Sequence, residues 1–369
     1  MKIPFLNLAR THEPIRDELL QAISSILSSS DFISGKPVHD FEDDFKRFVG
    51  TRFAVALNTG TSALHLALVA CGVGEGDEVI TTPSTFVATT AAITYTGAKP
   101  VFVDTHPEEW TIDLNQVESV LSENTKAILP VHLHGRMCNM KELGLFARSH
   151  GLKIIEDACQ AHGADNEGVR PGEFSDAAAF SFYPGKNLGG IGEGGALVTN
   201  DSVVDERVRL LRNWGSDVRY QHLIHAYNYR MDSIQGAVLG IKLKHLDLWT
   251  QKRRLVADWY YKHLSNIPGI SLPAKNPGHV YHIFAIRTQF REEVRAALRK
   301  ATVEFSCHYP IPVHLQPAYS SLGYRRGDFP VAEQLANQWI SLPIDPGMIE
   351  EEVEFIGNVL RTELAGLSA

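Results

Sequence analysis

The chain has 369 residues, of which 44% are hydrophobic and 21% charged, and its formal net charge at pH 7 is −8. This composition is that of an ordinary globular protein, and the length suits about two domains. A mildly acidic chain without a dense run of lysine and arginine argues against a nucleic-acid partner and against an anionic membrane surface, so small molecules are the expected ligands.

The beginning of the chain lacks the basic segment, apolar run and small-residue cleavage site of a secretion signal. No apolar run approaches the roughly 18 residues that would span a bilayer. The four cysteines fit neither a zinc site nor a disulfide framework. We therefore expect a cytoplasmic protein.

Between about residues 54 and 200, short apolar runs alternate with helical stretches. The predicted strands are 53–57, 77–82, 99–104, 126–135, 152–157, 177–183 and 195–201. Alternation at this spacing predicts an α/β fold with a mostly parallel central sheet between helices. We assign this large domain, with the N-terminal segment, to residues 1–245.

The first predicted strand ends in Asn58-Thr59-Gly60-Thr61-Ser62, where a helix begins. Free N–H groups and the helix dipole favour an anion at such a place, and the hydroxyls of Thr61 and Ser62 add donors. The segment fits a capped helix with a glycine turn about equally well. It lacks the second and third glycines of a dinucleotide fingerprint.

Phe86 lies at a similar junction after the second predicted strand. It is either an ordinary core residue or a platform for a flat ring. Further along, His132 and His134 would share one face of a predicted strand and could bind a metal there. No third ligand accompanies them, so we predict no metal site.

Asp157 stands at the carboxyl end of the predicted strand 153–156. Open α/β sheets bind ligands at that end. By itself the residue would fit a helix N-cap better, because Asp is a preferred cap.

Lys186 lies between an apolar strand, which carries Ser181 and Tyr183, and a cluster of glycines. The glycines are Gly185, Gly189, Gly190, Gly192, Gly194 and Gly195. They run into a strand rather than open a helix, which predicts an irregular loop that passes close to a ligand. Desolvation would lower the pKa of a lysine flanked in this way and make its amine nucleophilic. By itself Lys186 would be read as a surface lysine.

From Arg230 the pattern becomes one long helical stretch that ends at Pro268-Gly269. We place a domain boundary within it, at residue 245. Residues 246–369 then form a smaller C-terminal α+β domain, in which the segments 280–288, 291–301, 304–310 and 350–364 mix strands and helices.

A carboxylate at a strand end, an anion site, an aromatic platform and a lysine are together the parts that a pyridoxal phosphate enzyme requires. The lysine binds the cofactor's aldehyde, the carboxylate partners its ring nitrogen, and the protein holds its phosphate. Loss of a proton from an amino-acid carbon leaves a carbanion. The protonated ring delocalises that charge only while a nearby anion such as Asp157 keeps the nitrogen charged.

The segments NTGTSALHLAL, EDACQAHGA and SFYPGKNLGGIGEGGALVTND resemble the nucleotide-sugar aminotransferases of the DegT/DnrJ/EryC1/StrS family. The likeness covers almost the whole chain, including AYNYRMDSIQGA and CHYPIPVHLQPAY, and implies the pyridoxal phosphate-dependent transferase fold type I. By this resemblance Lys186 and Asp157 are the catalytic pair. The other implied cofactor contacts are Gly60, Thr61, Ser62, Phe86, Gln160, Ser181 and, from a neighbouring subunit, Asn228.

The Asn228 contact implies a homodimer with shared sites. Candidates for sugar contacts are Tyr183, His308, Tyr309, His314 and Tyr319, although such residues are often ordinary half-buried packing. Candidates for diphosphate contacts are Arg219, Tyr220 and Arg230, because arginine suits phosphate geometry.

The likeness also implies an activity. Related sugar dehydratases carry histidine at the lysine position, so Lys186 favours transamination, with glutamate as the expected donor. SFYPGKNLG is similar to enzymes that aminate carbon 3 of a nucleotide-linked keto-hexose, with carbon 4 as the alternative. At Tyr229 and Gly236 the chain departs from the family pattern, which affects details of the dimer interface. A non-catalytic cofactor-binding relative and a nucleotide-dependent oxidoreductase remain rival functions.

Overall fold

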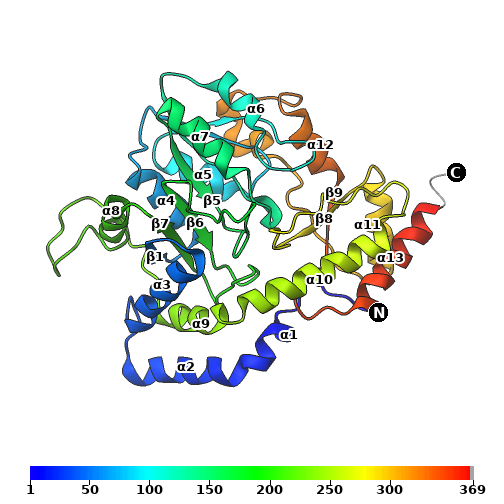
Figure 1. Cartoon of the computed structure of the whole chain (residues 1–369), viewed down its shortest axis with the longest axis horizontal. Helices are drawn as coiled ribbons and strands as arrows, with labels where there is room; N and C mark the ends of the chain where they lie inside the picture. The colour runs from blue at the N-terminus through cyan, green and yellow to red at the C-terminus, as the bar shows by residue number, and fades with distance from the viewer. Residues whose placement is uncertain (366–369) are drawn as a thin grey trace.

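The computed structural model describes residues 1–365, and these contain a seven-stranded sheet enclosed by helices (Figure 1). In chain order the strands are β1 (Phe53–Leu57), β2 (Glu78–Thr81), β3 (Lys99–Phe102), β4 (Thr125–Ile128), β5 (Lys153–Asp157), β6 (Ala177–Ser181) and β7 (Gly195–Thr199). Their order across the sheet is β1-β7-β6-β5-β4-β2-β3. β7 is antiparallel to both neighbours and the other pairs are parallel, so the mostly parallel sheet is confirmed.

The sheet and a smaller pair of strands are surrounded by helices. The helices are α1 (Leu8–His12), α2 (Arg16–Ser29), α3 (Lys36–Val49), α4 (Gly60–Ala70), α5 (Val87–Tyr95), α6 (Leu114–Val117), α7 (Met140–His150), α8 (Ser202–Arg212), α9 (Ser233–Leu243), α10 (Leu246–Leu264), α11 (Arg291–Lys300), α12 (Pro330–Gln338) and α13 (Glu350–Ala365). Within residues 1–365 none of them combines the length and the apolar character that a membrane crossing requires.

Both faces of the sheet are buried, each under its own apolar cluster. Successive strand residues point to opposite faces and so join different clusters. Ile80 and Ile128 face a cluster that includes Phe41 and Phe45 of α3. Their neighbours along the strands, such as Val79, face a second cluster built largely from α4, α5 and α8. Burial on both faces explains why the strands read as continuous apolar runs.

The C-terminal part has its own apolar cluster, around a two-stranded sheet of β8 (Phe284–Arg287) and β9 (Trp339–Leu342). Tyr260 of α10 and Ile356 of α13 belong to it, as does Ile3 from the start of the chain. Figure 1 shows α10 running from beside α9 towards α11 and α13. The sequence pattern did not predict β9, and the domain boundary at residue 245 stays a prediction.

Two expected elements are wrong. The long helical stretch divides into α9 and α10, because Lys244 and His245 form a tight turn whose N–H groups bond to the carbonyls of Ile241 and Lys242. The strand expected over 126–135 ends at Ile128. Beyond it the chain turns, and His134 has a φ of 62° inside a short 3-10 turn, so His132 and His134 do not share a strand face.

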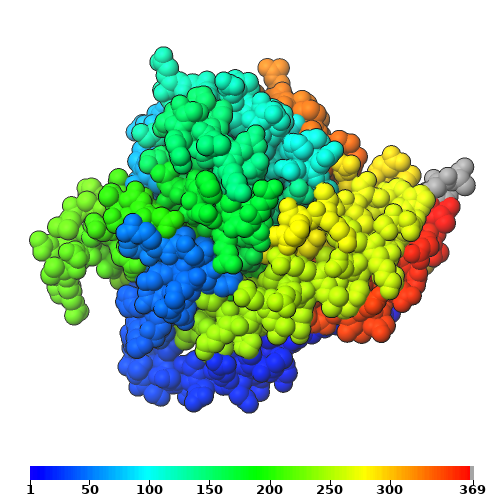
Figure 2. Space-filling view, viewed as in Figure 1, coloured from blue at the N-terminus to red at the C-terminus, as the bar shows by residue number. Residues whose placement is uncertain are grey.

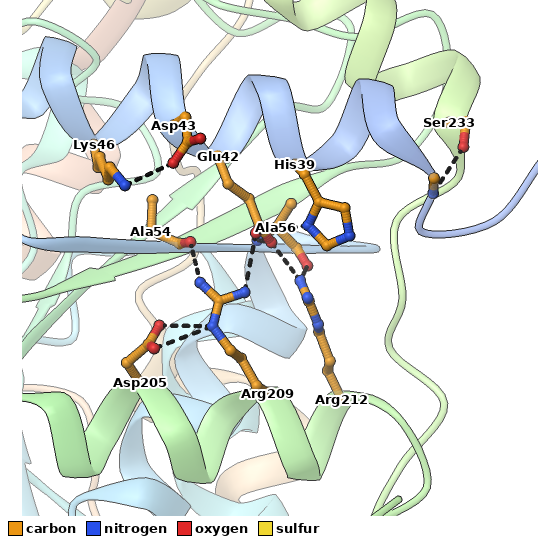
Figure 3. A network of polar contacts seen from close by, with 11 residues as sticks. His39, Glu42, Asp43, Lys46, Ala54, Ala56, Asp205, Arg209, Arg212 and Ser233 are labelled. Carbon is orange, nitrogen blue, oxygen red and sulfur yellow. Dashed lines mark hydrogen bonds and ion pairs between the residues drawn. The ribbon is translucent and has the colours of Figure 1, made fainter. Parts of the chain in front are cut away.

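A buried ionic network joins α3, β1 and α8 (Figure 3). Glu42 accepts hydrogen bonds from Arg209, from Arg212 and from the N–H of Ala56. Arg212 also donates to the carbonyl oxygen of Ala56 at 2.8 Å, and Arg209 donates to Asp205. The network fixes β1, the strand that leads to Gly60.

Residues 213–228, here called the projecting segment, leave the end of α8 and extend away from the body as the green projection in Figure 2. The segment exposes apolar side chains, among them Trp214, Tyr220 and Leu223. Its last residue is followed by Tyr229, whose N–H donates to the carbonyl of Arg212 and whose carbonyl accepts from the N–H of Asn58. The base of the projecting segment is therefore tied to both α8 and the end of β1.

Candidate active site

A cavity of about 630 Å³ opens at the carboxyl ends of the parallel strands. These predicted site residues line it: Gly60, Thr61, Phe86, Asp157, Gln160, Ser181, Tyr183, Lys186, His308 and Tyr309. A larger hollow of about 860 Å³ lies beside α11 and contains none of the predicted residues. We therefore take the smaller cavity as the candidate active site.

Asp157 ends β5 and presents its carboxylate to this cavity. Thr89 Oγ1 donates to Oδ2 over 2.6 Å, and the N–H of Cys159 donates to Oδ1 over 3.2 Å. Two donors on different oxygens fix the orientation of the carboxylate. The helix-cap alternative is wrong, because no helix lies between β5 and β6 in the described chain.

Lys186 lines the same cavity, on the loop between β6 and β7. Burial lowers the pKa of its amine, and the charges of Cys159 and Asp157 oppose that effect in part. The surface-lysine alternative is thereby wrong, because the side chain lies in the active-site cavity. A lowered pKa increases the fraction of neutral, nucleophilic amine at neutral pH.

Two glycines bring the polar backbone of this region together. A Cβ on Gly195, at the start of β7, would clash with the carbonyl of Thr59. A Cβ on Gly60 would lie 2.6 Å from the Cβ of Ser181. Glycine at both positions therefore lets β6, β7 and the start of α4 approach one another, as expected for a loop that lies close to a ligand.

The start of α4 is both a capped helix and an open anion site. Thr59 Oγ1 accepts from the N–H of Ser62 over 2.9 Å, and the hydroxyls of these two residues lie 2.9 Å apart. Ser62 is buried and does not line the cavity. Gly60 and Thr61 occupy the first turn, where N–H groups have no intrahelical acceptor. With the hydroxyls of Thr61 and Ser181 they form a set of donors suited to a phosphate.

Phe86 and Gln160 contribute to another side of the cavity. Phe86 is 52% exposed, so the core-residue alternative is wrong. Its ring centroid lies 5.4 Å from that of Tyr309. Gln160 accepts from the N–H of His134 over 2.6 Å and donates to the hydroxyl of Tyr309 over 3.3 Å. These contacts orient the Gln160 amide and the Tyr309 ring towards one region.

Two histidines of the cavity are neutral. Burial and the nearby Lys186 lower the pKa of His308 to about 4, and its Nδ1 lies 2.8 Å from Ser341 Oγ. Burial and Lys186 also lower the pKa of His282 well below its ordinary value. Its Nδ1 lies 3.3 Å from Asn187 Oδ1. The imidazoles of His282 and His308 are therefore uncharged and do not compete with Lys186 for protonation.

The remaining predicted residues lie elsewhere. Asn228, Arg219 and Tyr220 are exposed on the projecting segment, and Arg230 follows it. His314 and Tyr319 are buried in a small cluster with Phe102 and Phe329, where His314 Nε2 lies 3.1 Å from Glu333. The structure does not bring these six residues into the cavity of a single chain.

Several lining residues were not predicted from the sequence: Phe5, Leu6, Leu64, Thr85, Ala88, Val131, Cys159, Glu193, Arg253, His282, Ile283 and Ile344. Thr59, His132 and Gly185 also line the cavity. The sequence had indicated them only as part of the anion segment, the histidine pair and the glycine-rich loop. Thr89, which bonds to Asp157, was also missed. It lies three residues after Phe86, one helical turn along, so the spacing could have suggested it. Arg253 and His282 come from the C-terminal part, and no local pattern connects them with Asp157.

His132 and His134 have separate polar partners. His132 Nε2 lies 2.7 Å from Glu156 Oε2, and His134 Nε2 lies 3.0 Å from the carbonyl oxygen of His308. Within residues 1–365 no group of three or more His, Cys, Asp or Glu side chains is arranged to hold a metal ion.

A model of the DegT/DnrJ/EryC1/StrS aminotransferase family matches residues 13–361. The chain belongs to this family. A relative from Streptomyces venezuelae, named dTDP-3-amino-3,4,6-trideoxy-alpha-D-glucose transaminase, is 45% identical over 347 residues, which cover 94% of this chain and 92% of the relative. Membership of the DegT/DnrJ/EryC1/StrS family confirms the predicted enzyme class, an aminotransferase.

Solved structures of similar proteins agree with this assignment. The S. venezuelae protein DesV, in complex with a ketimine intermediate, has a TM-score of 0.96 and 43% identity, with 98% of each chain covered. The Bacillus subtilis protein NtdA, with bound cofactor PMP, has a TM-score of 0.91 and 30% identity, with 98% of this chain and 85% of NtdA covered. The likeness to these two structures confirms the predicted fold type I.

Proposed function

We propose that this protein is a pyridoxal phosphate-dependent aminotransferase that transfers the amino group of glutamate to carbon 3 of a nucleotide-linked keto-hexose. The observation that carries the proposal is the presence of Lys186 and Asp157 in one cavity beside the anion site at the start of α4. The family is one of aminotransferases, and NtdA holds PMP. Both support a cofactor of the pyridoxal phosphate type.

The donor set of the cavity fits this cofactor. Asp157, held by Thr89 and Cys159, provides an oriented anion for a protonated ring nitrogen. The start of α4 provides N–H and hydroxyl donors for a phosphate, and the half-exposed Phe86 provides a flat apolar face. When bound, pyridoxal phosphate would supply an electron sink for the negative charge that develops at the donor's α-carbon.

The residues of this chain then have defined tasks. Lys186, with its lowered pKa, provides a neutral amine at Nζ that takes a proton from the α-carbon of the amino donor and would pass it on to the bound cofactor in the same half-reaction. In the second half-reaction the same amine would move a proton the opposite way, to the sugar carbon that receives the amino group. Asp157 stabilises positive charge at the ring nitrogen. Gln160 is oriented by His134 and Tyr309 to donate to an oxygen of the ring. Amino donor and keto-sugar use the same cavity in turn, which requires ping-pong kinetics.

A homodimer completes the proposed site. Asn228, Arg219, Tyr220 and Arg230 lie on or beside the projecting segment, outside the cavity of their own chain. The segment carries exposed apolar side chains, which is typical of a protein–protein interface. A second copy of the chain would bring this segment, with its phosphate-binding residue types, to the cavity.

The decisive experiment is a single-turnover reaction with glutamate. We expect the wild-type protein to bind pyridoxal phosphate, absorb visible light and lose that absorbance when glutamate is added. Lys186→Ala should lack both the visible band and turnover, whereas Lys36→Ala, an exposed lysine on α3, should behave like wild type. A Lys186→Ala protein that keeps the band after dialysis and still aminates sugar would overturn the proposal.

Carbon 3 is supported by the name of the Streptomyces venezuelae relative, a 3-amino-sugar transaminase. A panel of nucleotide-linked 3-keto and 4-keto hexoses, with products weighed by mass spectrometry, tests the position. If the enzyme converts the 4-keto sugars in preference, the proposed position of amination is carbon 4 and not carbon 3.

A further inference from the structure

Arg253 of α10 is a buried arginine that reaches the active-site cavity from the C-terminal part of the chain. Only 4% of the residue is exposed, yet it lines the same cavity as Lys186 and Asp157. Its neighbours around the cavity include His282, Ile283 and Ile344. The guanidinium is therefore the strong cation on this side of the cavity.

The hydrogen bonds of Arg253 leave half of its guanidinium unused. Nη1 donates to the carbonyl oxygens of Tyr281 and Ile344, each over 3.1 Å. Nε is buried without a partner, and Nη2 makes no hydrogen bond to any residue in the described part of the chain. The two carbonyls thus fix the plane of the group. Nη2 remains as an oriented donor without a partner in the described chain, and Nε is enclosed beside it.

Within residues 1–365, Arg253 also has no carboxylate in direct contact. The other fully buried arginine, Arg212, bonds to Glu42. Burial lowers the pKa of Arg253 to about 10, and the charge of Asp345 opposes that effect only in part. Asp345 instead accepts hydrogen bonds from the N–H groups of Asn7 and Gly347. Burying a cation without an anionic partner is unfavourable, so the surroundings of the Arg253 guanidinium lack an anion that a ligand could supply.

The cavity has a separate place for each anion of the reaction. The phosphate of the cofactor has its donors at the start of α4, and Asp157 occupies the position of the ring nitrogen's counterion. Phe5, Leu6, Ile283 and Ile344 provide apolar surface in the same cavity, suited to the hydrocarbon chain of a small acid. A rigidly oriented guanidinium with an unpaired Nη2 group suits a carboxylate, which would accept a charge-assisted hydrogen bond from it.

We propose that Arg253 binds a carboxylate of the amino donor and so selects an acidic amino acid for the first half-reaction. The inference rests on the proposed function, because it assigns a substrate to the same cavity. Arg253 acts by direct contact with the substrate. A carboxylate carried by the keto-sugar is the alternative source of the same chemistry.

The test uses glutarate, which has two carboxylates and no amino group and therefore binds without reacting. Calorimetry on the cofactor-loaded enzyme should show glutarate binding weakened about tenfold or more in Arg253→Gln, the range expected when a hydrogen-bonded charge is removed. Arg253→Lys should also bind more weakly, because an ammonium on a flexible stem lacks the planar, preoriented donors of the guanidinium. Arg254→Gln is the matched control, since Arg254 donates to the carbonyl of His279 and does not line the cavity.

Kinetics provide the second readout. In Arg253→Lys we expect the KM for glutamate to rise by about tenfold or more, while the KM for a nucleotide-linked keto-sugar without a carboxylate stays within about twofold of wild type. The melting temperature and the cofactor content of each variant show whether it is folded. If Arg253→Gln does not fold, the binding test uses Arg253→Lys alone. Unchanged glutarate binding in both variants, or equal loss in Arg254→Gln, would overturn the proposal.

Two outcomes separate the alternatives. A loss confined to carboxylated keto-sugars, with glutarate binding intact, would overturn the assignment to the amino donor. If the wild-type enzyme binds glutarate through Arg253 but glutamate never removes the visible band, the carboxylate site stands and the proposed function fails.

Discussion

Thr89 Oγ1 lies 2.6 Å from Asp157 Oδ2, so a hydroxyl in the first turn of α5 holds the carboxylate at the end of β5. A second hydroxyl, Thr85 Oγ1, lies 2.6 Å from Thr89 Oγ1 and extends this series of hydrogen bonds. All three side chains are buried. The orientation of Asp157 towards the cavity therefore depends on a helix that is 68 residues away along the chain.

Replacement of Thr89 by valine should loosen Asp157 without changing the volume of the core. We expect Thr89→Val to bind the cofactor more weakly and to lower kcat about tenfold, the effect of about 1.4 kcal/mol for one lost hydrogen bond to a charged group. Thr90→Val is the matched control, because Thr90 is equally buried on α5 and its hydroxyl has no partner. Equal activity of the two variants would show that Asp157 does not need Thr89.

Asp157→Asn tests the ionic role of the carboxylate. The amide keeps the size of the side chain, but it carries no negative charge, and its single oxygen can accept from only one of the two donors, Thr89 and Cys159. We expect kcat to fall by at least about a hundredfold, as when one preorganised group is removed from an active site. Rates of both half-reactions, measured by stopped-flow absorbance, check this. Unchanged kinetics would mean that another group partners the ring nitrogen.

The sequence predicted the sheet and the central site because both depend on local patterns. Continuous apolar runs predicted the strands, and Asp157 and Lys186 follow strands whose ends meet at one edge. The turn at Lys244–His245 was missed because the apolar periodicity continues across it. Arg253 was missed because its place at the cavity depends on how α10 packs beside the sheet, which no short-range pattern encodes.

The placement of the substrate residues was the weaker part of the prediction, for a related reason. Aromatic and histidine side chains occur in cores and in sites alike. His308 and Tyr309 line the cavity, whereas Tyr319, only ten residues further on, packs with Phe102. Residue type alone does not distinguish these environments, because the local fold decides which side of the segment faces the cavity.

The lowered pKa of Lys186 predicts a specific pH dependence. Burial disfavours the ammonium form, so in the cofactor-free protein the amine should become neutral at a lower pH than the ordinary value of 10.5. Competitive acetylation across a pH series, with peptides quantified by mass spectrometry against free lysine amide, measures that midpoint. Because Asp157 raises the pKa of Lys186, Asp157→Asn should move the midpoint lower still. A midpoint at or above 10.5 in the wild-type protein would contradict the assignment.

The ionic network at Glu42 predicts how stability responds to acid. Burial raises the pKa of this carboxyl, but the charges of Arg212 and Arg209 and the hydrogen bonds outweigh burial and lower the pKa below 4.5. A carboxyl with a lowered folded-state pKa stabilises the protein above its unfolded-state pKa, and that contribution is lost as the pH falls through the folded-state value. Glu42 should therefore contribute fully at pH 7 and lose its effect only in acid.

Glu42→Gln removes the charge that faces Arg209 and Arg212 and leaves two cations beside β1 (Figure 3). We expect a loss of about 3 kcal/mol in unfolding free energy at pH 7, because one partner of a buried ion pair is removed. The difference from wild type should stay constant down to about pH 4.5 and shrink below it. Urea denaturation across this range measures the difference. Asp43→Asn is the control: Asp43 is also on α3 but pairs with Lys46 at the surface, where ion pairs contribute little. An equal effect of the two substitutions, or a difference that grows in acid, would contradict the role assigned to Glu42.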